Sequence, residues 1–266
     1  MYTQRSKYWP AYTWKAQRSY SSEIKGKLLG NFNISDTDFE KTYFDIFDKV
    51  NASFYHLERL KENEKIAVQT GKELAKMQIP ETEGVVGVAG SPYEPIEYEY
   101  EAFLVTIKSA LDFMAILLAN GFSKSEDNIV ALVNRMQSDK INPSLLEGKI
   151  YALLSNTQFS AFIDNYKNPK NQKSKRNFAV HKGSLPIGTI NIPINNPHTL
   201  PLLSKVIDPN DLDPYASIPH SQNLVEFCEN QFYQTCDLLI EVLSLITNTR
   251  LKPGPKSSVY DQRVTK

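Results

Sequence analysis

Apolar residues recur at three- and four-residue steps along much of the chain, a spacing that places them on one face of an α-helix. Long stretches with this spacing cover residues 33–77, 97–122, 125–139, 142–168 and 223–250. Polar and charged residues fill the other positions, so each stretch is predicted to be amphipathic. The pattern predicts a mainly all-α protein, a bundle of about five helices.

Capping residues mark the beginnings of these predicted helices. Ser35 or Asp36 is the expected N-cap of the first helix and Ser125 that of the third, because a side-chain oxygen there accepts a hydrogen bond from a free backbone N–H. Pro143 fits the first position of the fourth helix, where no N–H is needed. The first helix is expected either to run through or to break near residues 62–64.

Two segments interrupt the helical pattern. Residues 79–97, "IPETEGVVGVAGSPYEPIE", are rich in Gly and Pro, and a flexible linker explains them better than a nucleotide-binding loop, since no strand-turn-helix context accompanies the glycines. Residues 189–194, "TINIPI", alternate apolar and polar side chains, which predicts one or two short strands. We therefore expect a small loop or β-hairpin insertion, residues 184–200, before the last helix.

These patterns divide the chain into three parts. Residues 1–95 are expected to form an N-terminal helical extension packed on the core, and residues 96–250 the main helical bundle. Residues 251–266 are expected to be a loose C-terminal tail.

Composition and charge argue against several classes of protein. The 30 basic and 30 acidic residues cancel, so no overall field draws the chain to nucleic acid or to an anionic membrane. The most apolar segment contains Lys108 and Asp112, and we expect it to be too interrupted to cross a bilayer. The N-terminal residues mix aromatic and charged side chains and do not resemble a signal peptide, so a cytoplasmic location without membrane contact is expected.

Cysteine usage agrees with a reducing compartment. Only Cys228 and Cys236 are present, eight residues apart in one predicted helix. A helical rise of about 12 Å then separates them, so they cannot form a disulfide with each other. Both are expected to be small side chains of the core.

Most motifs that mark a reaction or a metal site are missing. His56, His198 and His220 have no Cys, His or acidic neighbours at metal-ligand spacing and are expected at the surface or at an interface. Residues 208–215, "DPNDLDPY", do not match a calcium-binding loop, and no P-loop, GxSxG, zincin or CxxC motif occurs. We therefore expect no metal and no cofactor.

The densest basic cluster, residues 167–183, contains a candidate reaction centre. Arg176 and His181 are five residues apart in "RNFAVH", so helical backbone would bring them to one side. An arginine grips a phosphate with two hydrogen bonds, and a histidine takes or gives a proton near neutral pH. Together they suit metal-independent RNA cleavage, with His181 as general acid or base and Arg176 stabilising the phosphorane. Asn177 is expected to orient the phosphate or the imidazole.

The same stretch also has an ordinary explanation. On spacing alone, a solvated basic loop that happens to end in a histidine is the more frequent case. If the stretch binds RNA, its lysines contact the sugar-phosphate backbone and carry little sequence information. These lysines are Lys167, Lys170, Lys173, Lys175 and Lys182.

The form R-N-x-x-x-H of residues 176–181 resembles the signature of the HEPN superfamily. Its members are helical, mostly dimeric ribonucleases and nucleotide-binding proteins of toxin-antitoxin, abortive-infection and CRISPR-associated systems. The order of helix, helix, motif and helix is similar as well. Residues 98–119 take the place of the earlier core helix and residues 223–246 that of the closing helix, so the resemblance extends over residues 96–248.

This resemblance implies a HEPN-like bundle with metal-independent endoribonuclease activity, acting in defence or stress response. It makes Arg176 and His181 the catalytic pair, Asn177 their polar neighbour, and Glu101 or Asp112 a supporting acid. Two motifs meet at the subunit interface in that family, which implies a homodimer with a composite site. The expected partners are RNA, a second copy of the chain, and an antitoxin or another defence-system protein.

Two features depart from the family pattern. Gly183 stands where the subgroup modified by a partner nucleotidyltransferase has a Tyr, which argues against that toxin-antitoxin variety. The insertion at residues 184–200 is atypical and either gates the site or blocks it. A non-catalytic HEPN-like module that binds a nucleotide, RNA or a protein is therefore the alternative. For Glu101, Lys108 and Asp112 the other explanation is a solvated polar ridge with a Lys108–Asp112 ion pair.

Overall fold

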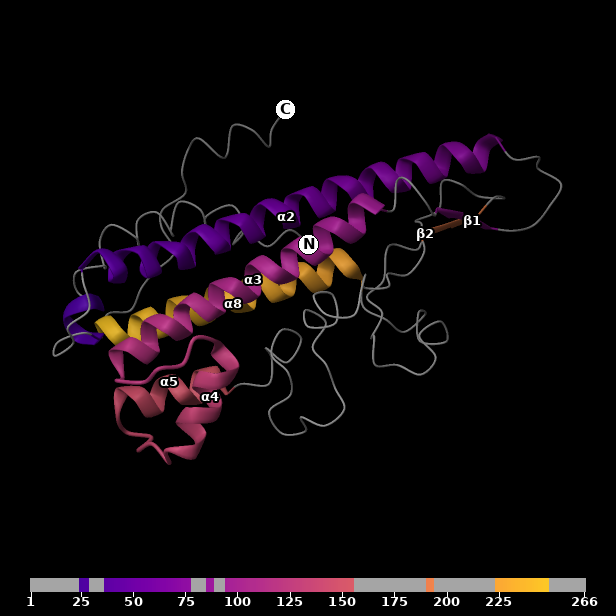
Figure 1. The fold of residues 1–266 in the computed structure, drawn as a ribbon. Helices are drawn as coiled ribbons and strands as arrows, with labels where there is room; N and C mark the ends of the chain where they lie inside the picture. Colours follow the sequence, from indigo (N-terminus) through magenta and orange to yellow (C-terminus); the bar gives the residue numbers. More distant parts are fainter. Residues whose placement is uncertain are drawn as a thin grey trace. The chain divides into compact units, whose positions relative to one another are not determined.

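The computed structural model describes residues 24–28, 36–77, 85–88, 94–155, 190–193 and 223–248, most of which are helical. The helices are α2 (Asp36–Met77), α3 (Glu94–Gly121), α4 (Ile129–Ser138), α5 (Leu146–Leu154) and α8 (Leu224–Thr247), with a short helix over residues 24–28. Strands β1 (Val85–Val88) and β2 (Ile190–Pro193) form a two-stranded sheet (Figure 1). The prediction of a mainly all-α protein is confirmed.

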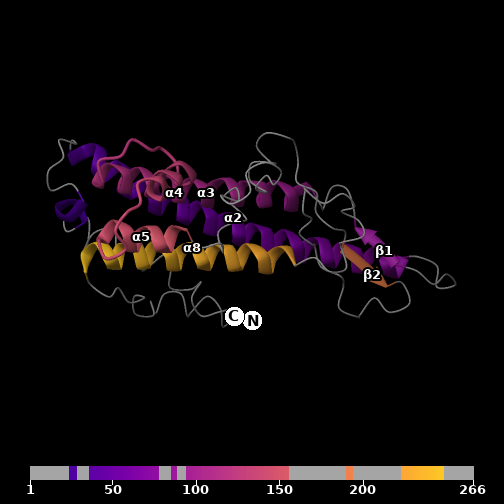
Figure 2. The same cartoon turned by 90° about the horizontal axis from the view of Figure 1, so that it is seen from below.

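The described residues fall into two compact units. Unit 1 comprises residues 24–28, 36–51, 106–155 and 232–248. Unit 2 comprises residues 52–77, 85–88, 94–105, 190–193 and 223–231. Helices α2, α3 and α8 are each divided between the units, with one segment in unit 1 and the other in unit 2. Within each unit the three segments lie side by side (Figures 1 and 2). The division of the chain near residues 95 and 250 stays a prediction.

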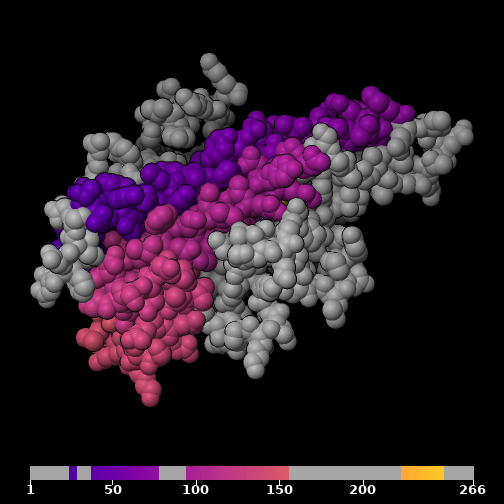
Figure 3. Space-filling model, in the orientation of Figure 1, coloured from indigo at the N-terminus to yellow at the C-terminus, as the bar shows by residue number. Residues whose placement is uncertain are grey.

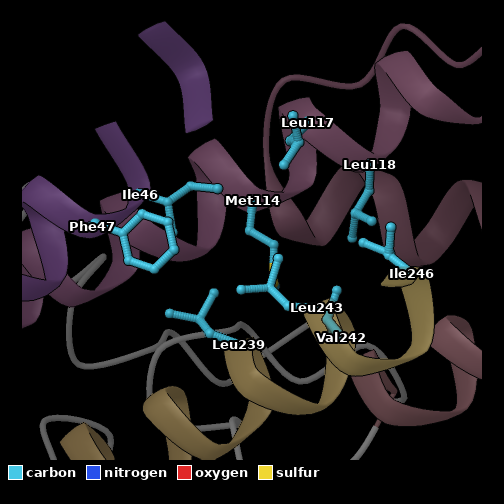
Figure 4. Close-up of a pocket in the computed structure, with 9 residues that line it drawn as sticks. All are labelled: Ile46, Phe47, Met114, Leu117, Leu118, Leu239, Val242, Leu243 and Ile246. Carbon is cyan, nitrogen blue, oxygen red and sulfur yellow. The ribbon is translucent and has the colours of Figure 1, made fainter. Parts of the chain in front are cut away.

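Unit 1 has an apolar interior. Phe47 of α2, Leu111 of α3 and Val242 of α8 are buried there. The interior contains a cavity of about 10 Å³, which holds no more than about one water molecule (Figure 4). Only apolar side chains surround it, so a water would find no hydrogen-bond partner, and the cavity is a packing defect. Its lining residues are Ile46, Phe47, Met114, Leu117, Leu118, Leu239, Val242, Leu243 and Ile246.

α4 and α5 pack against each other in unit 1, and the space-filling view shows them continuous with the adjoining part of α3 (Figure 3). The N-cap of α4 is Asn128, whose side-chain oxygen accepts a hydrogen bond from the Ala131 N–H at 2.9 Å. The expectation that Ser125 caps this helix is therefore wrong. Asn128 is also a preferred N-cap residue and lies next to the first buried position, Ile129.

α5 begins later than its sequence suggests. Pro143 precedes the helix because the Asn142 side chain accepts the Ser144 N–H at 2.9 Å and closes a turn. Gly148 explains why the chain packs so tightly here, since a Cβ atom at this position would lie 2.2 Å from the Asn142 carbonyl oxygen. α5 ends at Leu154, and the rest of the predicted helix, residues 156–168, lies outside the described residues.

The short helix over residues 24–28 fastens the beginning of the described chain to unit 1. Leu28 lies against Gly121 at the end of α3, where a Cβ atom would come within 2.7 Å of the Leu28 Cβ. The Lys27 ammonium donates to the Thr247 carbonyl oxygen at 3.0 Å and so satisfies a free acceptor at the end of α8. A cation at a helix C-terminus also favours the helix dipole.

Unit 2 has a core of leucine and aromatic side chains. Leu57 and Leu60 of α2 are fully buried, and so is Phe103 of α3. The Tyr100 ring of α3 meets the Phe227 ring of α8 edge to face, with their centroids 6.4 Å apart.

α2 runs through unit 2 without a break, which settles the alternative left open for residues 62–64. Two ion pairs follow this helix at three-residue spacing, Lys61 with Glu58 at 2.7 Å and Arg59 with Glu62 at 2.6 Å. Pairs at this spacing support a helix.

The two-stranded sheet joins distant parts of the chain. β2 confirms the strand predicted in residues 189–194, but its partner is β1, within residues 79–97, which were predicted to be a linker without strands. The strands are antiparallel, with Val86 opposite Ile192 and Val88 opposite Ile190. The valines of β1 are good strand formers, but the prolines and glycines around them obscure that signal.

α3 is long and apolar enough to cross a membrane by length and composition, the one helix among the described residues that is. Lys108 and Asp112 therefore do not exclude α3 by composition alone. Both charges are accommodated by pairing with each other. In the most apolar window of α3, 61% of the segment is buried inside the molecule, as in the core helix of a soluble protein.

Both cysteines lie in α8, and both are buried and free, as predicted. Cys228 belongs to unit 2 and Cys236 to unit 1. Burial raises the pKa of both thiols well above the ordinary value of 9.0, and nearby carboxylates, Glu64 for Cys228 and Asp237 for Cys236, act in the same direction.

Candidate functional site

The predicted catalytic and RNA-binding residues lie outside the described residues. They are Arg176, Asn177 and His181 with Lys167, Lys170, Lys173, Lys175 and Lys182. The same holds for His198 and His220 and for most of the insertion, of which residues 190–193 form β2. Of the predicted site residues, Glu101 and Asp112 are described, the first in unit 2 and the second in unit 1.

Asp112 has a clear structural task. Its Oδ1 atom accepts a hydrogen bond from the Lys108 ammonium and another from the Ile129 N–H, at 3.0 Å. Ile129 is the first residue of α4, so the carboxylate satisfies one of the free N–H groups at the start of that helix. The expected Lys108–Asp112 ion pair is confirmed, but Lys108 is buried, so the expected solvated ridge is wrong at that position.

Glu101 lies half-buried on α3, on the same side as other acids. Glu94, Glu97 and Glu101 follow one another at three- and four-residue steps. Burial raises the pKa of Glu97, and the negative charges of Glu101 and Glu94 raise it further. A raised carboxyl pKa, as at Glu97, is a property of acid–base groups but also of ordinary acidic clusters.

His56 has an acidic partner from another helix, which its neighbours in the sequence do not show. Its Nδ1 atom lies 2.7 Å from Oε2 of Glu99, a residue 43 positions later, and joins α2 to α3. Because a carboxylate only accepts hydrogen bonds, Nδ1 carries the proton in this pair and Nε2 is the nitrogen directed elsewhere. The side chains are 24% and 19% exposed. Glu99 thus fixes the orientation of the imidazole, as carboxylates do for functional and structural histidines alike.

Arg59 and Tyr55 complete the surroundings of His56. The Arg59 Nε atom lies 3.9 Å from Oε1 of Glu99, and its Nη1 atom pairs with Glu62. The Tyr55 ring stands edge-on to the imidazole, with the centroids 5.4 Å apart. Two carboxylates already neutralise the single arginine, so this cluster offers no surplus positive charge for a phosphate. The geometry fits a polar link between α2 and α3 best.

A second polar link connects α2 with α8 in unit 2. The Lys61 ammonium lies 2.8 Å from Glu229 and 2.7 Å from Glu58. Burial alone would lower the pKa of Lys61, but hydrogen bonds to Glu229 and Glu58 outweigh it and raise the pKa. Lys61 therefore remains charged and binds both carboxylates.

Neither polar link could be predicted from spacing within one helix. Both join residues far apart in the sequence, so they become visible only once the pairing of the helices is known. A sequence signal for contact between α2 and α3 is present on α2, where His56 and Asn63 are seven residues apart and share a face. The Asn63 side chain donates a hydrogen bond to the Pro95 carbonyl oxygen of α3 at 3.3 Å. Polar residues that line the edge of an apolar helix face indicate a place where polar links to a neighbouring helix can form.

Sites for a metal or a larger ligand are not found in the described part of the chain. No three His, Cys, Asp or Glu side chains gather there closely enough to hold a metal ion. The apolar cavity of unit 1 is too small for a cofactor.

Comparisons with known proteins add no relative. No family model matches the chain, and the searches of curated proteins and of solved structures find no significant match. The resemblance to the HEPN superfamily, an expectation from the sequence, depends on residues 176–181 and on the order of the helices.

Proposed function

We propose that the chain is a metal-independent endoribonuclease of HEPN type. The observation that carries this proposal is the sequence "RNFAVH", residues 176–181, placed between α5 and α8. Arg176 grips the scissile phosphate, and His181 transfers the proton of the 2′-hydroxyl or of the leaving 5′-oxygen. Asn177 orients one of the two, and the neighbouring lysines hold the RNA backbone.

The helical frame around the motif supports the proposal. α3 and α8, which correspond to the earlier and the closing core helix of the resemblance, are both long and largely buried. The order α3, α4, α5, motif, α8 agrees with a motif that precedes the last core helix. Glu101 is the better supporting acid of the two proposed, because Asp112 is already engaged by Lys108 and by the start of α4.

The proposed setting follows from the same resemblance. Two copies of the chain form a composite site, so the active species is a homodimer. The protein acts on RNA in the cytoplasm during defence or stress, with an antitoxin or another defence protein as its regulator.

Incubation of the purified protein with single-stranded RNA in EDTA tests the proposal. The wild type is expected to produce fragments that end in a 2′,3′-cyclic phosphate. Arg176→Ala and His181→Ala are each expected to lower the cleavage rate by about 100-fold or more, since each removes a group that acts in the transition state.

His56→Gln is the matched control, because His56 is a histidine of this chain engaged by Glu99 and not by the motif. It is expected to cut RNA at the wild-type rate. Cleavage by His181→Ala at the wild-type rate would exclude the assignment. RNA binding without any cleavage by the wild type would favour the non-catalytic alternative.

A further inference from the structure

One outer face of α2 in unit 2 exposes large apolar side chains. Tyr55 is 59% exposed and Ile66, eleven residues later, is 54% exposed. Eleven residues make about three helical turns, so the two side chains lie on the same face. Arg59 and Glu62 lie between them on this face, while the fully buried Leu57 lies on the opposite face. We call Tyr55, Arg59, Glu62 and Ile66 the α2 stripe.

The α2 stripe has the spacing of a helix–helix contact. Its residues follow one another at steps of four, three and four, the spacing at which one helix of a coiled coil contacts its partner. A solvent-facing side of a helix has no need of two large apolar side chains at such positions. The spacing therefore indicates that a second helix packs along the α2 stripe.

The charges of the α2 stripe are of both signs. The Arg59 Nη1 atom lies 2.6 Å from Oε2 of Glu62, and the two side chains are largely exposed. An exposed pair of this kind contributes little to the stability of its own helix. Because the two charges are adjacent and opposite, each is also available to an opposite charge on a partner.

The α2 stripe is complementary to itself when one copy is reversed. Its order is apolar, basic, acidic, apolar, and its steps are the same in both directions. A two-fold axis between residues 60 and 61 therefore places Tyr55 of one copy opposite Ile66 of the second copy, and Arg59 opposite Glu62, each twice. A parallel arrangement would instead place Arg59 opposite Arg59. The charges thus favour an antiparallel pair.

The residues beside the α2 stripe carry the same complementarity. Glu58 and Lys65 are exposed and lie along one edge of the stripe. In the antiparallel arrangement, Glu58 of each copy comes near Lys65 of the second copy. Opposite charges at such flanking positions set the orientation of paired helices.

We propose that the α2 stripe is a surface through which two copies of the chain associate, with their α2 helices antiparallel. The inference concerns assembly, is argued from α2 alone and does not rest on RNA cleavage. The stripe is about 17 Å long by helical rise. A contact of this length is at the low end of specific interfaces, below about 1,200 Å². The dimer is therefore expected to be reversible, with a dissociation constant on the order of 10 μM.

Sedimentation velocity of the full chain without RNA tests the surface. The wild type is expected to dimerise, and Ile66→Glu is expected to weaken the dimer by about tenfold or more, because it places a charge against Tyr55 of the second copy. Leu74→Glu is the matched control. Leu74 is also an exposed apolar residue of α2 in unit 2, 44% exposed, but it lies about 80° around the helix from Ile66. This variant is expected to dimerise as the wild type does.

Charge exchange tests the antiparallel register. Arg59→Glu and Glu62→Arg each place like charges opposite one another, so each variant alone is expected to dimerise at least tenfold more weakly. The variant with both changes is expected to recover the wild-type affinity. A mixture of the two single variants is expected to form a mixed dimer, because each then faces the opposite charge of the other. Formation of that dimer also shows that both variants are folded.

The outcomes separate this inference from the proposed function. A wild type that is monomeric at about 100 μM, or an Ile66→Glu variant that dimerises normally, overturns the α2 stripe as a contact between copies. Failure of both the double variant and the mixture overturns the antiparallel register. A dimer that none of these substitutions weakens uses another surface, which overturns the inference and leaves the proposed homodimer standing. RNA cleavage is measured separately, so its absence decides against the ribonuclease without deciding the assembly.

Discussion

The two units are built from the same three helices but differ in what fills the space between them. In unit 1, the surfaces of α2, α3 and α8 are apolar around a small cavity, and the buried polar side chains of this unit, Lys108, Thr235 and Thr247, do not line it. In unit 2, buried Ser53, Asn63, Glu64 and Gln231 accompany the leucines and aromatic rings. Its helices are joined by polar links from α2, His56 to Glu99 and Lys61 to Glu229.

This difference indicates different kinds of stability. Apolar burial is non-directional and contributes roughly in proportion to area, whereas a buried polar link fixes one geometry and is costly when one partner is lost. Unit 1 is therefore expected to be the more stable frame. Unit 2 is expected to be the part whose arrangement is specified by a few directional contacts, and it also contains β1 and β2.

The largest expected effect is at Gly148 in unit 1. Gly148→Ala places a Cβ atom 2.2 Å from the Asn142 carbonyl oxygen, and backbone must move to relieve the contact. We expect a loss of about 3 kcal/mol in the free energy of unfolding, measured by urea denaturation.

Gly26→Ala is the matched control, since nothing lies within 4 Å of a Cβ atom there and alanine favours the helix. It is expected to leave stability unchanged or to raise it by about 0.5 kcal/mol. A Gly148→Ala variant as stable as Gly26→Ala would contradict the close approach of α5 to Asn142.

A smaller effect is expected at Lys61 in unit 2. Lys61→Met leaves Glu229, whose side chain is 20% exposed, without its cation, so we expect a loss of about 2 kcal/mol. Lys124→Met in unit 1 is the matched variant: Lys124 also binds two carboxylates, of Asp139 and Glu147, and these side chains are 28% and 23% exposed, somewhat more than Glu229. Its expected cost is about 1 kcal/mol. An equal loss of unfolding free energy in the two variants would contradict the expectation that a polar link stabilises unit 2 more than unit 1.

The pH dependence of the Lys61 link has a definite sign. Hydrogen bonds to carboxylates raise the pKa of Lys61 above its ordinary value of 10.5 despite burial. The stabilisation is thus complete below pH 10.5 and is lost as the pH rises through the raised pKa. The stability difference between wild type and Lys61→Met should therefore be constant near neutral pH and shrink in strong alkali.

Sequence periodicity predicted the helices well because it records which face of each helix is buried. The long helices agree with the predicted ranges, and apolar residues within those ranges, among them Phe47, Leu57, Leu111 and Met114, are buried. Helix ends were predicted less well, since neighbouring residues compete for the same capping role. Asn128 rather than Ser125 caps α4 for this reason.

Contacts between distant segments were missed because their signal is not local. The four residues of β1 form a strand only with β2, about a hundred residues later, and nothing in residues 79–97 alone indicates that partner. The partner of His56, Glu99, is likewise 43 residues away and is identified only once α2 and α3 are paired. The motif at residues 176–181 was noticed for the opposite reason: its chemistry is contained in one short stretch.

The smallest expected effect is a difference in thiol reactivity between the two units. It compares their stabilities directly, because each unit contains one buried thiol. Cys236→Ala leaves Cys228 as the reporter of unit 2, and Cys228→Ala leaves Cys236 as the reporter of unit 1. Both thiols are buried, so the reaction with a disulfide reagent requires local opening. In urea below the unfolding transition, Cys228 is expected to react about tenfold faster than Cys236, since unit 2 depends on fewer apolar contacts. Each rate is divided by the rate of the same thiol in fully unfolded protein, which corrects for the intrinsic reactivity of the thiol.

Equal corrected rates would mean that both units open together. A faster reaction of Cys236 would mean that unit 1 is the less stable unit, opposite to the order argued from the interiors of the two units.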